Sequence, residues 1–121
     1  MFCLLGLASN HGYMLAQHNL AGMYYLGNGI PRNYAEAIRL EKLAADQGLA
    51  SAQIMLGIMY MEGQGVAQDY VLAHMWINLS HAREGTEESA RLRDELARKM
   101  TAAQIAEAQH RAREWGKMKK E

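Results

Sequence analysis

The stretch of sequence that decides the fold covers residues 52–76 and reads AQIMLGIMYMEGQGVAQDYVLAHMW. A second copy of this pattern lies 36 residues earlier and begins at residue 16. The identical pairs include Ala16 and Ala52, Gln17 and Gln53, Leu20 and Leu56, Tyr24 and Tyr60, Gly27 and Gly63, Gly29 and Gly65, Tyr34 and Tyr70, and Ala37 and Ala73. A fixed period in this range indicates a stacked array of repeats.

Each copy predicts two helices joined by a Gly-x-Gly turn. Glycine ends a helix readily because it adopts positive φ without a Cβ penalty. Asn33 and Asp69 follow the two turns, and each is placed to cap the second helix of its copy. Glu36, three residues after Asn33, is expected to complete a capping box. The expected helices cover residues 13–27, 33–48, 50–63 and 69–83.

Residues 1–12 continue the pattern by one further period. Moving them forward by 36 residues places Leu4 on Leu40, Leu7 on Leu43, Ala8 on Ala44 and Gly12 on Gly48. We therefore interpret this segment as the second helix of a preceding repeat, which predicts about seven helices and an apolar, open N-terminal end. The expected single domain then consists of a half repeat (1–12), two repeats (13–48 and 49–85) and two capping helices (86–121).

The second copy resembles the Sel-one-like repeat (SLR), a relative of the tetratricopeptide repeat. The resemblance is carried by Leu56-Gly57-Ile-Met-Tyr60, Gly63-Gln-Gly65-Val66, Asp69-Tyr70, Ala73 and Trp76. The first copy departs from the family pattern at Ala21, Asn33 and Leu40, where the family has Gly, Asp and Trp. The resemblance covers about residues 1–85. It implies an α/α solenoid of antiparallel helix pairs, wound into a right-handed superhelix, that acts as an adaptor in protein assemblies.

The segment after Gly85 loses the period and becomes strongly charged. Thr86 is placed to cap one helix, and Thr101 with Gln104 forms the capping box of another. A repeat array needs a polar end, so we expect two antiparallel capping helices, similar to the ends of bacterial SLR proteins.

The composition excludes several classes of protein. Abundant Ala, Leu, Met, Gln and Glu favour helices, and no stretch alternates like a strand, so the expected class is all-α. Thirteen basic and thirteen acidic side chains cancel, which disfavours a nucleic-acid or membrane-surface partner. The apolar N-terminal run is too short to span a bilayer and has no basic n-region. Cys3 is the only cysteine, and the lack of a disulfide framework slightly favours the cytoplasm.

The sequence contains no arrangement that predicts catalysis or metal binding. Five histidines are scattered, and the two that share a predicted helix, His74 and His81, are too far apart to hold one ion as an i, i+4 pair. No Ser or Cys lies in a local signature with a base, and Cys3 is expected in an apolar helix that keeps the thiol inert. We therefore expect no enzyme, no metal and no cofactor.

A set of first-helix positions remains after the packing positions of the repeat are assigned. In tetratricopeptide-type arrays these positions line the concave surface, and here they form an apolar stripe larger than a soluble monomer usually exposes. We predict that this first-helix face binds a peptide or helix of a partner protein. It consists of Leu15, His18, Tyr25, Leu26, Ile54, Ile58 and Met61.

Two alternatives cover the same face within the chain. The C-terminal helix could fold back onto it through Ile105, Ala108, Ala112 and Trp115, or lateral packing between first helices could bury most of it.

Two other functions stay open. The chain could be a structural module that forms a homodimer through the N-terminal half repeat, using Phe2, Leu4, Leu5 and Leu7. The third hypothesis is binding or hydrolysis of a small molecule, because some SLR proteins have been linked to cell-wall-like molecules. No catalytic motif in this sequence supports it.

Overall fold

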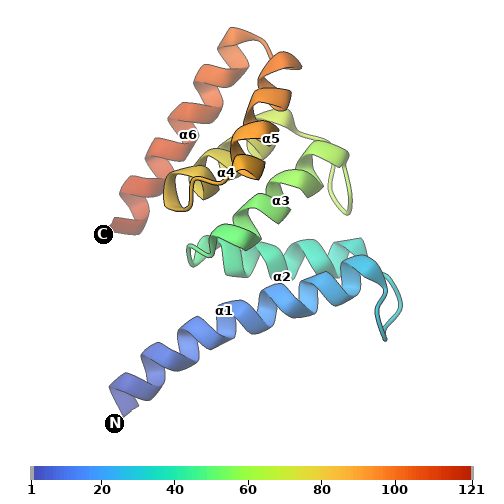
Figure 1. Cartoon of the computed structure of the whole chain (residues 1–121), viewed down its shortest axis with the longest axis vertical. Helices are drawn as coiled ribbons and strands as arrows, with labels where there is room; N and C mark the ends of the chain where they lie inside the picture. Colours follow the sequence, from blue (N-terminus) through green and yellow to red (C-terminus); the bar gives the residue numbers. More distant parts are fainter. Residues whose placement is uncertain (1, 121) are drawn as a thin grey trace.

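The structure is a computed structural model that describes the backbone of residues 2–120 and the side chains of residues 12–119. The described residues form six helices and no strand, which confirms the all-α class. Neighbouring helices pack in sequence order from α1 to α4, and both α5 and α6 pack on α4 (Figure 1). The helices are α1 (Phe2–Leu26), α2 (Tyr34–Asp46), α3 (Ala50–Glu62), α4 (Tyr70–Arg83), α5 (Glu87–Arg98) and α6 (Ala102–Lys120).

The predicted helix caps are present in both repeats. Asn33 Oδ1 accepts a hydrogen bond from the Glu36 backbone N–H at 3.1 Å. Asp69 Oδ1 accepts one from the Leu72 N–H, also at 3.1 Å. The glycines of both Gly-x-Gly turns have positive φ, as expected for residues that leave a helix through the left-handed region. The two repeats are therefore built from the same local signals.

The prediction that Glu36 completes a capping box is wrong. The Glu36 carboxylate pairs with Arg39 one turn further along α2. It is not needed at the helix start, because the Asn33 N–H already donates to the Tyr24 carbonyl at 2.9 Å.

The helix break expected near Gly12 is absent, so the described chain has six helices rather than about seven. α1 runs from Phe2 to Leu26 without interruption, and its N-terminal half extends beyond α2 (Figure 1). The counterpart of Gly12 is Gly48, which has φ +95° just before α3 packs onto α2. A Cβ at Gly12 would meet nothing within 4 Å. Within the described part of the chain no neighbouring element holds a turn at this position, and a continuous helix satisfies the backbone hydrogen bonds locally.

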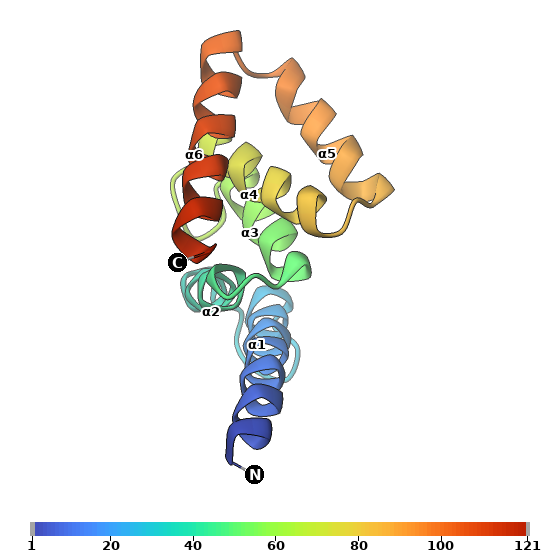
Figure 2. The same cartoon turned by 90° about the vertical axis from the view of Figure 1, so that its left-hand side faces the viewer.

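The C-terminal segment forms the two expected capping helices. Thr86 Oγ1 accepts from the Ser89 N–H at 3.1 Å and begins α5. Thr101 and Gln104 make the reciprocal bonds of a capping box at the start of α6, at 2.9 and 3.1 Å. Figure 2 shows α5 and α6 meeting at one end of the molecule, with α6 returning along α4.

The core is continuous from α2 to α5. Its buried apolar members include Ala37, Ala44, Ala52, Leu56, Met59, Ala73, Trp76, Ile77, Leu92 and Leu96. Small residues let the helices approach closely, and the larger ones fill the remaining space. Among the described residues, no helix is both long and apolar enough to cross a membrane.

Candidate functional site

The α1 part of the first-helix face is the more accessible part. Leu26 is 62% exposed, and Leu15 is also exposed. Tyr25 is held within the fold, because its hydroxyl donates to Gln64 Oε1 at 2.9 Å and its ring lies against Tyr34 with centroids 5.3 Å apart. Tyr25 therefore links the first repeat to the turn of the second.

The α3 part of the same face is largely used for packing. Ile54 and Ile58 are half-buried against the core, and Met61 is buried within it. Ile54 lines a small cavity near the start of α5, separate from the residues of α1. The structure thus brings His18 and Leu26 together but does not join them to the α3 residues in one groove. The predicted self-association residues Phe2, Leu4, Leu5 and Leu7 have side chains outside the described range.

A partly buried histidine–glutamate pair joins α1 to α2. His18 Nδ1 lies 2.6 Å from Glu41 Oε1, and the Glu41 side chain is only 2% exposed. The hydrogen bond to the Glu41 carboxylate raises the pKa of His18, and burial raises the pKa of Glu41. Both directions mean that the folded pair holds its proton more tightly than the separated groups do.

Glu41 is a residue that the sequence analysis overlooked. Its counterpart one period later is Ile77, which is fully buried. A carboxylate at a position where the other repeat has isoleucine is a signal of a buried polar contact, because buried charges are paired. The comparison of the two copies position by position could have revealed it.

An open cavity lies beside this pair, between α1 and α3. Its volume is about 280 Å³, and its walls combine the imidazole of His18 with amide and apolar side chains. We call it the His18 cavity. It is lined by His18, Asn19, Gly22, Met23, Leu26, Asn28, Glu41 and Met55.

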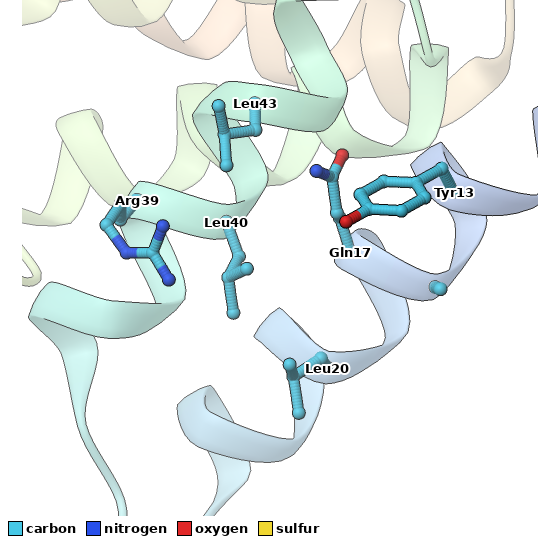
Figure 3. A pocket seen from close by; sticks show the side chains of 7 residues that line it. Tyr13, Gln17, Leu20, Arg39, Leu40 and Leu43 are labelled. Atoms are coloured by element: carbon cyan, nitrogen blue, oxygen red, sulfur yellow. The ribbon is translucent and has the colours of Figure 1, made fainter. Parts of the chain in front are cut away.

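A second hollow lies between α1 and α2 and was not predicted. Its volume is about 350 Å³. Figure 3 shows Leu20, Leu40 and Leu43 reaching into the same space from the two helices, with Arg39 at the rim. We call it the end groove, and it is lined by Tyr13, Ala16, Gln17, Leu20, Arg39, Leu40 and Leu43.

The other polar side chains form structural contacts. His74 is buried and lies 3.0 Å from Asn78, and burial lowers its pKa. His81 Nδ1 lies 2.7 Å from Ser89 Oγ and ties α4 to α5. Within the described part of the chain, no three His, Cys, Asp or Glu residues are grouped as a metal site would require.

The comparisons with known proteins agree with this geometry. The model of the Sel1 repeat family matches residues 15–49 and 50–80. A protective antigen of uropathogenic Escherichia coli strains, which displays an SLR fold, is 30% identical, with a TM-score of 0.83 over 89% of this chain. A Sel1 repeat protein from Oxalobacter formigenes is 34% identical, with a TM-score of 0.66 over 75% of this chain and 68% of that protein.

This chain spans 23% of the length of the Escherichia coli protein. No curated protein matches it. The matched repeats make up more than half of the sequence, and the chain therefore belongs to the Sel1 repeat family.

Proposed function

We propose that this chain is a non-enzymatic interaction scaffold that binds a peptide or a helix of a partner protein on its first-helix face. Sel1 repeats generally mediate interactions between proteins, and the SLR fold is typically a non-catalytic scaffold. The observation that carries the proposal is the exposure of Leu26 at the edge of the His18 cavity. An apolar side chain beside a hollow with polar walls is what peptide-binding surfaces offer.

The His18 cavity suits a peptide because its walls offer both kinds of contact. Met23 and Met55 are flexible apolar side chains that adapt to differently shaped ligands. Asn19 and Asn28 offer amide groups that both donate to and accept from a peptide backbone. The His18–Glu41 pair keeps the wall rigid by tying α1 to α2. The cavity volume of about 280 Å³ fits one or two side chains of a bound segment.

A random peptide library displayed on phage tests the proposal. Peptides selected on the full chain should shift the backbone NMR resonances of His18, Gly22 and Leu26. Leu26→Asp should weaken binding of the best peptide at least about tenfold, because it replaces the exposed apolar contact at the edge of the cavity with a charge. Met118→Asp is the matched control, since Met118 is equally exposed apolar surface on α6, and it should leave affinity unchanged.

Two results would overturn the proposal. One is a selected peptide whose affinity is the same for Leu26→Asp and the unsubstituted chain. The other is a set of shifted resonances that lies away from α1 and α3.

A further inference from the structure

The end groove has a counterpart in the second repeat, and there the occupant is visible. Moving its residues forward by 36 places the end groove between α3 and α4. The corresponding pairs are Ala16 and Ala52, Gln17 and Gln53, Leu20 and Leu56, Arg39 and Met75, Leu40 and Trp76, and Leu43 and Leu79.

Two helices cover this counterpart groove. On its α3 side, Gln53 Nε2 donates to the Ala45 carbonyl of α2 at 3.1 Å, and on its α4 side Trp115 of α6 enters. Its ring meets Trp76 edge to face, with centroids 5.9 Å apart. It also lines a small cavity together with Gln53 and Leu79. Ala108, seven residues before Trp115, is fully buried, and Ala112 packs against the core. Small side chains at these positions let α6 lie close to α4 while the indole enters the groove.

In the first repeat, the same groove is open among the residues that the structure describes. α1 and α2 carry a similar residue pattern, yet Leu20 is exposed where Leu56 is fully buried, and Leu43 is exposed where Leu79 is half-buried. Leu40 stands where the second repeat has the larger Trp76, which leaves room for a bulky ring. An apolar hollow of about 350 Å³ between two helices is the kind of surface into which an amphipathic helix packs.

We propose that the end groove binds an amphipathic helix of a partner protein, in the way that α4 binds α6. The contact face of that helix carries a large aromatic residue, with small residues three and seven positions before it. This surface differs from the first-helix face, so the proposal stands or falls separately from the one above.

Two details specify the partner further. Trp115 Nε1 is buried and has no hydrogen-bond partner among the described residues, so the aromatic contact depends on apolar burial rather than on the indole N–H. Phenylalanine is therefore expected to bind about as well as tryptophan at this position of the partner helix. Arg39, which pairs with Glu36, lies at the rim where the second repeat has Met75, so a polar residue on the partner helix beside the aromatic ring is favoured over an apolar one.

A synthetic peptide with the sequence of residues 102–120, labelled with fluorescein, is the probe, and fluorescence anisotropy reports its binding to the full chain. The double variant Leu20→Asp and Leu43→Asp should weaken binding at least about tenfold. Both leucines are exposed, so the variant should keep the circular dichroism spectrum of the original chain. Met118→Asp is again the control and should bind the probe normally.

Changes in the peptide test the required chemistry. Replacing the residue that corresponds to Trp115 by Ala should reduce affinity at least about tenfold, whereas Phe should stay within about threefold. Leu26→Asp in the chain should have no effect, which separates this site from the first-helix face.

Three results would overturn the proposal. The first is absence of peptide binding. The second is equal binding to the double variant, which would mean that the peptide enters the α4 site or another surface. The third is a dimer in sedimentation analysis that the double variant abolishes, which would identify a second copy of the chain as the occupant.

Discussion

The two repeats carry the same pattern but bury it to different extents. Leu56 and Met59 in α3 are both 0% exposed, whereas their counterparts Leu20 and Met23 in α1 are 39% and 40% exposed. The difference lies in the neighbouring helices. α3 packs on both α2 and α4, and α4 also packs on α6, whereas among the described residues α1 packs extensively on α2 alone. A repeat sequence therefore specifies a surface that fits a helix, and the surroundings decide whether that surface becomes core or binding site.

The largest expected effect on the free energy of unfolding comes from truncating the paired leucines, Leu56 and Leu20, to alanine. Leu56→Ala should lower the free energy of unfolding by about 3 kcal/mol, because it leaves a cavity in a closed core. Leu20→Ala should cost about 1 kcal/mol, since its side chain already contacts solvent. Urea unfolding followed by circular dichroism measures both. Equal losses would mean that the α1 surface is covered in solution.

The features that the sequence predicted correctly depend on local chemistry. Asn33, Asp69, Thr86 and Thr101 cap their helices as expected, because a cap needs only residues within one turn. The paired glycines were predictable for the same reason.

The features that could not be predicted depend on which elements are neighbours. Gly12 has the sequence context of Gly48, but among the described residues nothing packs against it, and the chain does not turn there. The end groove escaped prediction because its residues look like core residues in the repeat pattern. The first-helix face remains a prediction, with Leu15 and Leu26 exposed and Met61 buried.

The second glycine of each turn gives the next sharpest comparison. A Cβ at Gly65 would lie 2.6 Å from the Tyr34 carbonyl oxygen, whereas one at Gly29 would meet nothing within 4 Å. Both glycines have positive φ, so alanine is strained by about 1 kcal/mol at either position. Gly65→Ala should cost about 2 kcal/mol more than Gly29→Ala, because the turn must also move away from α2. Thermal unfolding of the two variants tests this, and equal melting temperatures would contradict it.

A smaller effect on the free energy of unfolding is expected at Gly57, a position where the two repeats differ in sequence. Gly57 allows α3 to approach α4, since a Cβ there would lie 2.6 Å from Ile77 Cγ1 and 3.1 Å from the Ala73 carbonyl oxygen. The first repeat has Ala21 at this position. Gly57→Ala should destabilise the chain by about 1 kcal/mol, even though alanine is the better helix former. A gain in stability in urea unfolding would show that α3 and α4 separate easily.

The smallest expected effect on the free energy of unfolding is that of Glu41→Gln. Glu41 is the carboxylate at the position where the second repeat has Ile77. The pKa of His18 is raised above its ordinary 6.5 by Glu41, so the folded chain binds this proton more tightly than the unfolded chain does. The resulting stability is fully present below pH 6.5 and is lost as the pH rises through the raised value. The pKa of Glu41 is also raised, so its contribution to the unfolding free energy likewise declines as the pH rises above its ordinary pKa of 4.5.

Burial of His74 acts with the opposite sign, because its pKa is lowered and its contribution is lost as the pH falls. That contribution is common to the original chain and to Glu41→Gln, so the difference between their unfolding free energies isolates the pair. This difference should favour the original chain most at low pH and should decline as the pH rises past 6.5. A difference that stays constant or grows with pH would show that the pair does not hold its proton in the folded state, and that Glu41 joins α1 to α2 by packing alone.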